Sequence, residues 1–383
     1  RWIWIDPEKK PLEMEKYGIS ESKIVHFSFE SGQPKSEAKI SRTINEQEIV
    51  NALRKLAREG ERTVYCLQGH GEGDLDSPTD GGYLFLKEAI QGENVKVKKL
   101  SIAETGKIPS DAGLLLVVAP KKSLLPAEKA AIEDYLKAGG NAVFLSEPRS
   151  TSDIADLVKP LGINVGNDII LDQVVRMFAG PGIGVQPMVT TYGAHQATKG
   201  FTEGTVFSTA SSVTRASNVP ENAQVTELAL TSANSWAEKD IEKVFSDKPI
   251  ASRDPEDIRG PVGIVAAFEG VYPKGQFQRA SDEGAAKPVD EVAGKKSRVI
   301  VIGDSDFVAN VNIRSLYNSD FFLGLINWTL GEDTGVTISS RTLRQSRNVL
   351  TDEQFGTIFV LSGIVFPELL LIIGLGVWWF RKK

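Results

Sequence analysis

From residue 63 onward, short apolar runs alternate with stretches whose apolar residues have helical spacing. The apolar runs lack polar alternation, which is typical of parallel strands that are buried on both faces. These predicted strands are Thr63–Leu67, Val95–Leu100, Leu114–Ala119, Ala142–Leu145 and Arg298–Gly303. The predicted helices between and after them are Gly82–Ile90, Pro126–Lys137, Ile154–Leu161 and Asp320–Leu330. The alternation predicts an α/β fold with a doubly wound parallel sheet over residues 59–330.

Residues 173–294 interrupt this rhythm. They are rich in Gly, Ser, Thr and Asn, with strand-like pieces at Val185–Thr191, Thr226–Leu230 and Val262–Phe268. We interpret this stretch as a large β-rich insertion into the α/β domain.

The first 58 residues read as the end of an upstream domain. Trp2–Asp6 and Lys23–Ser28 have strand character, and Asn45–Ala57 has helical spacing. The chain begins at Arg1 in what reads as a strand already under way, so we expect Arg1 to be a cut within a longer protein, and the missing targeting signal is uninformative.

The C-terminal segment is the most apolar part of the chain. Residues 331–354 form a linker, and Gly356–Phe380 contains one ionisable residue, Glu368. This length predicts a transmembrane helix within 355–383, with a buried core helix as the less favoured alternative. The basic end Arg381–Lys383 weakly favours a cytoplasmic C-terminus, which would place the main domain outside the cytoplasm.

Composition narrows the class of protein. The 383 residues contain 44 Lys plus Arg and 50 Asp plus Glu, for a net charge of −6. This balance does not favour a nucleic-acid partner. The apolar fraction of 41% excludes a wholly disordered chain and a polytopic membrane protein. Cys66 is the one cysteine, so a disulfide framework and a Cys-based zinc site are excluded.

The first candidate site follows the Thr63–Leu67 strand. Gly69, His70, Gly71 and Glu72 stand where ligands gather in open α/β sheets, and the glycines allow close main-chain approach. His70 and Glu72 are candidate ligand-binding or acid–base groups. The favoured alternative is a structural turn held by local bonds between them.

The second candidate site follows the Arg298–Gly303 strand. Asp304, Ser305 and Asp306 are candidate ligand-binding residues that either bind a cation or cap the next turn. If the two strand ends adjoin, one polar crevice would contain both sites. No recognisable metal-ligand spacing is present, so we predict no metal and no cofactor.

No catalytic nucleophile is evident. Cys66 lies within an apolar strand, and the turn after Leu114–Ala119 reads Pro120–Lys122, without Ser or Cys at an elbow. Dinucleotide-binding and P-loop motifs are absent. We therefore predict that the protein is not an enzyme.

Two further segments carry weaker signals. Tyr192–Thr198 contains His195, which most simply belongs to a polar loop. Pro367 and Glu368 lie near the middle of the apolar run, where a carboxylate is costly unless it faces protein or is protonated. We predict that this pair contacts a permease, the alternative being a protonated Glu on a tilted helix.

Several segments together carry a family resemblance. They are Tyr65–Glu72, Gly139–Asn141 with Glu147–Pro148, Tyr192 with His195 and Thr198, Thr231–Ser232 with Ser235–Trp236, and Gly303–Phe307 with Asn310, Phe321–Phe322 and Asn327–Trp328. This set resembles the gliding-motility-type (GldG-like) auxiliary components of bacterial ABC transporters. Glu368 departs from the expected anchor because it is more polar than such helices usually are.

The resemblance implies a flavodoxin-like domain related to class I amidotransferases but without their catalytic residues. It also implies that residues 1–58 are the remnant of an upstream, possibly thioredoxin-like domain. The implied partners are an ABC permease, its ATPase and membrane lipid, with the main domain outside the bacterial inner membrane and the C-terminus in the cytoplasm.

Three functions follow as hypotheses. The leading one is a non-catalytic, membrane-anchored auxiliary subunit whose outer domain binds a substrate or a partner protein. The alternatives are a hydrolase or amidotransferase-like enzyme that uses the Gly69–Glu72 strand edge, and a purely structural scaffold in a cell-envelope complex.

Overall fold

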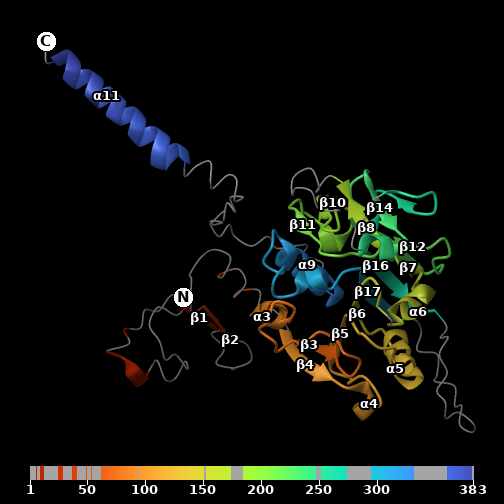
Figure 1. Ribbon diagram of the computed structural model, residues 1–383. Helices are drawn as coiled ribbons and strands as arrows, with labels where there is room; N and C mark the ends of the chain where they lie inside the picture. The colour runs from red at the N-terminus through yellow and green to blue at the C-terminus, as the bar shows by residue number, and fades with distance from the viewer. Residues whose placement is uncertain are drawn as a thin grey trace, which may run out of the picture. The chain divides into compact units, whose positions relative to one another are not determined.

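Figure 1 shows a computed structural model of the chain, with a sheet-based body and a separate C-terminal helix. It describes residues 62–331 except 94, 151, 174–183, 247–251 and 274–294, together with 360–381 and short pieces before residue 62. The chain divides into two units, Arg1–Ile338 and Ser339–Lys383, and each is described by itself.

An eight-stranded sheet forms the centre of the first unit, in the order β10-β13-β16-β17-β6-β5-β3-β4. Five of these strands are parallel neighbours: β3 (Arg62–Leu67), β4 (Val95–Leu100), β5 (Ala112–Val118), β6 (Ala142–Leu145) and β17 (Lys296–Ile302). Numbered along the chain, these five have the order 2-1-3-4-5, which is the flavodoxin-like order. The five predicted parallel strands are therefore confirmed.

The remaining three strands of the sheet are antiparallel to their neighbours and come from residues 173–294, where the sequence predicts a β-rich insertion. They are β10 (Thr191–Tyr192), β13 (Ala223–Leu230) and β16 (Gly263–Val271). β16 pairs antiparallel with β17 from Val265↔Ile302 to Val271↔Lys296, so strands from residues 173–294 extend the central sheet instead of forming a separate layer. β16 is largely buried, and its pairing with β13 and β17 satisfies the main-chain hydrogen bonds of a buried strand.

Helices cover both faces of the sheet. α3 (Leu84–Gly92) and α9 (Asn318–Thr329) pack with Val64, Cys66 and Leu116 in one core. α5 (Pro126–Lys137) and α6 (Ile154–Val158) pack with residues of the opposite sheet face, such as Leu115, in a second core. The doubly wound arrangement is thus present in the parallel half.

Smaller elements surround this framework. The further strands are β1 (Val25–Ser28), β2 (Glu37–Ile40), β7 (Ile163–Val165), β8 (Ile169–Asp172), β9 (Met188–Val189), β11 (Thr205–Val206), β12 (Val213–Arg215), β14 (Ser235–Glu238) and β15 (Ile258–Arg259). The short helices are α4 (Ile102–Thr105), α8 (Ile241–Val244) and the 3-10 turns η1 (Lys159–Leu161), η2 (Gln196–Thr198) and η3 (Asp306–Val308).

The two ends of the chain are described in part. β1 and β2 pair antiparallel, and most of residues 1–58 lie outside the described part, so the predicted upstream remnant stays a prediction. In the second unit, a π-helical turn η4 (Leu361–Val365) precedes α11 (Phe366–Arg381). Among the described residues, we find no helix whose length and apolar character together would suffice to cross a membrane. The predicted transmembrane helix therefore stays a prediction.

Candidate functional site

The loop after β3 lies at the point where the parallel strand order reverses, between β3 and β5. Ligands usually bind at such a switch point, beyond the carboxyl ends of the strands. Here the main-chain oxygen of His70 accepts hydrogen bonds from Lys121 N (2.8 Å) and Lys122 N (3.1 Å), which follow β5. Gly71 has a φ of +77°, a value that favours glycine, and brings its main chain close to Lys121. The two loops of the switch point therefore hold each other in place.

The His70 ring lies between two buried carboxylates. Its Nδ1 is 3.1 Å from Glu72 Oε1, and its Nε2 is 2.8 Å from Glu128 Oε2. Glu72 Oε2 also accepts from the main-chain N–H of His70 at 2.7 Å. Glu128 lies in the first turn of α5, where its Oε2 accepts from Leu125 N. His70 and Glu72 thus bind each other, as the structural-turn interpretation expects, and they also anchor the start of α5.

One oxygen of this cluster has no partner in the described part of the chain. Glu128 Oε1 is buried and makes no hydrogen bond there, although the other carboxylate oxygen makes two. The contacts that this cluster does make hold the Gly69–Glu72 turn against the start of α5.

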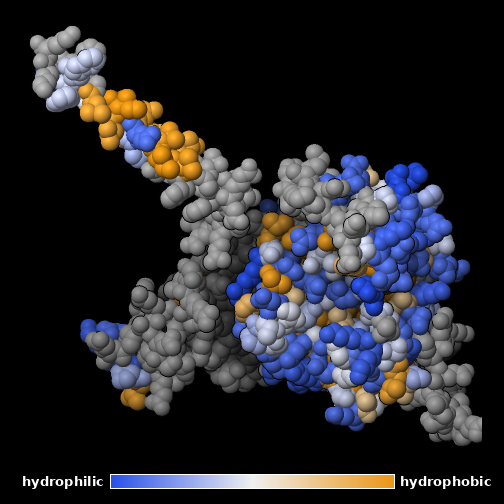
Figure 2. All heavy atoms as spheres, viewed as in Figure 1, coloured by the Kyte–Doolittle hydropathy of each residue, from blue (hydrophilic) through white to orange (hydrophobic). Residues whose placement is uncertain are grey.

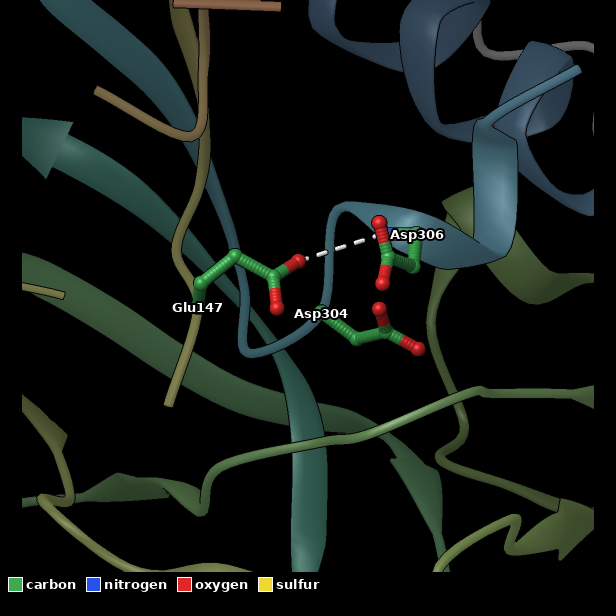
Figure 3. Close-up of side chains that lie close together, drawn as sticks. All are labelled: Glu147, Asp304 and Asp306. Atoms are coloured by element: carbon green, nitrogen blue, oxygen red, sulfur yellow. Dashed lines mark hydrogen bonds between the residues drawn. The ribbon is translucent and has the colours of Figure 1, made fainter. Parts of the chain in front are cut away.

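The loop after β17 forms a second cluster, with Glu147, which follows β6. Figure 3 shows Glu147, Asp304 and Asp306 with their carboxyl groups gathered beside one loop. Glu147 Oε1 accepts from Ser305 N (2.6 Å), Ser305 Oγ (2.6 Å) and Asp306 N (3.2 Å). Asp304 accepts from Ser208 N (2.5 Å) and Phe307 N (3.3 Å). These bonds connect β6, β17 and the segment after β11.

The surroundings of this second cluster favour the protonated forms of its carboxyl groups. Burial and the neighbouring Asp306 raise the pKa of Glu147 to about 7. Burial, with Glu147 nearby, raises the pKa of the fully buried Asp304 well above its usual range. Burial also raises the pKa of Asp306, opposed by the positive charge of Lys121. Three close carboxyl groups in a buried setting resist full ionisation.

Two groups of three carboxylates have the spacing that a cation would need. Glu147, Asp304 and Asp306 offer ligand oxygens within 4.8 Å of one another, as do Glu238, Asp254 and Asp257. In both groups internal donors already use several of the oxygens. Lys239 N and Asp254 N, for example, donate to the two oxygens of Asp257. In both groups, donors of the chain therefore compete with a cation for these oxygens.

The two predicted sites, Gly69–Glu72 and Asp304–Asp306, are connected through Tyr83. Tyr83 follows the Gly69–Glu72 loop, and its hydroxyl bonds to Ser305 Oγ at 2.8 Å. Burial raises the pKa of this hydroxyl. Among the described hydrogen bonds, none joins His70 or Glu72 directly to Asp304 or Asp306, so the predicted crevice is two adjacent clusters. Whether any of the predicted site residues binds a ligand stays a prediction.

The cysteine behaves as a core residue. Cys66 is buried within β3, and burial raises the pKa of its thiol to about 12. A thiol that stays protonated is a poor nucleophile, in agreement with the sequence interpretation.

The sequence interpretation assigned His195 to a polar loop. In the described part of the chain, this residue lines a polar pocket. This pocket of about 830 Å³ lies beside β10 and includes His195 and Glu269. Sequence reasoning also left out Glu128 and Glu147 as partners of His70 and Ser305. The signal for Glu147 is its place: it directly follows a buried strand whose neighbour is β17.

Pro367 and Glu368 lie in the first turn of α11. Both are exposed, as are the apolar residues that surround them on this helix. Their predicted permease contact stays a prediction.

The comparisons with known proteins give one family. The model of a family described as "ABC-type uncharacterized transport system" matches residues 61–329. No curated protein matches the chain.

Several solved structures share a broad likeness of fold. The mmIFT52 N-terminal domain is 15% identical, with a TM-score of 0.47, and covers 73% of this chain and 99% of its own. A ThuA-like protein from Bacteroides uniformis is 14% identical, with a TM-score of 0.38, and covers 70% and 91%. One from Parabacteroides merdae is 11% identical, with a TM-score of 0.41, and covers 74% and 94%.

Proposed function

Because the chain belongs to the family described as "ABC-type uncharacterized transport system", in which it is an auxiliary component, we propose that it is a membrane-anchored, non-catalytic subunit of a transporter. Its sheet-based domain lies outside the bacterial inner membrane and binds a substrate or a partner protein. The observation that carries this proposal is the family match, which covers the α/β body from β3 to α9.

The arrangement at the switch point supports a non-catalytic role. An enzyme needs side chains that are free to touch a substrate, whereas the side chains of His70, Glu72 and Glu128 are buried and both nitrogens of the His70 ring contact a carboxylate. Ser305 likewise bonds to both Glu147 and Tyr83. The polar groups at these strand ends serve the fold.

The C-terminal helix supports the membrane anchor and the permease contact. Figure 2 shows apolar residues along the visible face of this helix. Its exposed side chains include Phe366, Leu370, Ile372 and Trp379. A helix that exposes apolar side chains in this way needs an apolar environment. Membrane lipid and the permease together provide one, with Glu368 turned to the permease and the basic end in the cytoplasm.

Co-purification tests this proposal. We expect the affinity-tagged full-length protein, extracted in a mild detergent, to carry an ABC permease and its ATPase with it. Glu368→Leu should lower their recovery, because it removes the polar group that faces the permease, while Leu370→Ala on the same helix serves as the matched control. Recovery of a lone monomer in several mild detergents would contradict the proposal.

A further inference from the structure

The pocket beside β10 is a candidate binding site away from the clusters at the switch point. It has a volume of about 830 Å³, within the range of ligand sites in proteins. Its lining is mostly hydroxyl, amide and main-chain groups. The residues are Thr190–Gln196, Thr198–Thr202, Gln224 and Glu269.

The main chain of β10 provides an open edge at this pocket. β10 is the last strand of the eight-stranded sheet, and it pairs with β13 alone, as Thr191↔Leu230 and Tyr192↔Ala229. Gly193 N donates to Leu228 O at 3.0 Å, so by antiparallel alternation Tyr192 directs its main-chain N–H and C=O away from β13. In the strand order of the described residues β10 has no second neighbour, so these two groups lie at the outer edge of the sheet.

His195 supplies a fixed donor to the pocket. Its Nδ1 accepts from Ala197 N at 3.1 Å, so the neutral ring carries its proton on Nε2. Burial lowers the pKa of His195, which favours that neutral form. The ring packs edge-on against Trp328, with centroids 4.6 Å apart, and this contact fixes its orientation.

Glu269 supplies a fixed acceptor on the same scaffold. Its Oε1 lies 3.6 Å from the guanidinium of Arg298. That guanidinium lies over the Trp328 ring, 5.0 Å from its centroid, and donates to Trp328 O at 2.9 Å. Trp328 thus organises both the donor and the acceptor, which makes the pocket preorganised for a group that accepts one hydrogen bond and donates another.

The balance of charge selects the class of ligand. Among the lining residues, Lys199 and Glu269 carry opposite charges, so the pocket has no cluster of cations to bind phosphate. The aromatic residues do not offer a stacking platform, because Phe201 is buried and the Tyr192 ring packs against Phe201 and Phe321. An open strand edge favours main-chain recognition.

We propose that this pocket binds an extended, uncharged peptide segment of a partner protein, which pairs with Tyr192 of β10 and places a hydroxyl or amide side chain between His195 and Glu269. That the partner is a transporter component rests on the proposed function. The binding of a peptide is independent of that function, because it is inferred from the open edge of β10 and from the preorganised pair His195 and Glu269.

A peptide screen tests the pairing. A synthetic library of random heptapeptides with blocked ends is screened against the full-length protein in mild detergent, and the tightest binder is remade with N-methyl groups at alternate residues. In an added strand, only every second N–H faces β10. We expect one methylated set to lose about tenfold or more in affinity and the other to lose little. Equal losses in both sets, or binding of a neutral oligosaccharide such as cellotriose without any peptide, would overturn the proposal.

Substitutions in the pocket test the side-chain contact. Glu269→Gln keeps the shape but removes the charged acceptor, and Gln224→Ala removes an exposed amide. We expect Glu269→Gln to weaken the selected peptide about tenfold, and Glu256→Gln, an exposed glutamate outside the pocket, to leave it unchanged. If Glu269→Gln, Gln224→Ala and Glu256→Gln all bind the selected peptide with equal affinity, this result would count against the site. Co-purification with the permease is a separate measurement, so the failure of one proposal is distinguishable from the failure of the other.

Discussion

The two polar regions of the sheet differ in what their side chains contact. At the carboxyl ends of the parallel strands, His70 and Glu147 are held in clusters of mutual hydrogen bonds. At the antiparallel edge, the pocket beside β10 keeps Thr191 and Gln196 exposed and Tyr192 with an open main-chain edge. In the first region, where α/β proteins usually bind ligands, these side chains hold the loops together. The binding that we propose lies instead at the edge that the antiparallel strands added.

The largest expected difference in stability is between substitutions of His70 and of His195. His70→Ala leaves the buried carboxylates of Glu72 and Glu128 without their shared partner, which should destabilise the fold by about 4 kcal/mol. His195→Ala loses an aromatic contact at a half-buried position and should cost about 1 kcal/mol. Urea denaturation followed by tryptophan fluorescence measures both. Equal losses in the free energy of unfolding would mean that the two regions contribute equally to the stability of the fold.

The acidic cluster predicts a pH effect confined to the parallel strand ends. Because the pKa of Glu147 is raised from 4.5 to about 7, the folded state holds its proton more tightly than the unfolded state does. The contribution of Glu147 to stability is therefore largest below about pH 4.5, and it is lost as the pH rises through 7.

Glu147→Gln isolates this effect. A glutamine oxygen can still accept the bonds from Ser305 and Asp306 but carries no charge. We expect the variant to be more stable than the wild type at pH 8 by about 2 kcal/mol, and similar to it at pH 5. Glu269→Gln, in the open pocket, retains Glu147 and should keep the wild-type fall in stability between pH 5 and pH 8. A wild-type stability that does not change between pH 5 and 8 would contradict the raised pKa.

The parallel half of the fold was predictable because the sequence of each of its strands and helices carries its own local signal. The run Leu114–Ala119 and the helix from Pro126 to Lys137 correspond to β5 and α5 with shifts of two residues at most. The pairing of Val262–Phe268 with β17 was not predictable in the same way. Strand direction and partner are set by contacts across the chain, and the Gly- and Ser-rich surroundings carry no local signal for them.

The candidate sites show the same limit. The pattern placed His70 and Glu72 in one turn, because they are two residues apart, but it could not identify Glu128, 58 residues from His70, as their partner. Pro126 does predict the helix start and so places Glu128 in the first turn, where its Oε2 accepts one of its two bonds, from Leu125 N. The second bond depends on how α5 lies against the switch point.

The smallest expected effect is on stability in the open pocket. Gln196 is exposed at the start of η2 and lines the pocket, and no described side-chain hydrogen bond depends on it. Gln196→Ala should therefore change the free energy of unfolding by less than about 0.5 kcal/mol. Urea denaturation of the full-length protein measures this, with His70→Ala as the positive control. A loss above about 1.5 kcal/mol would mean that the open edge also serves the fold, and the contrast between the two regions would then fail, because it requires the pocket to be polar surface that folding leaves unused.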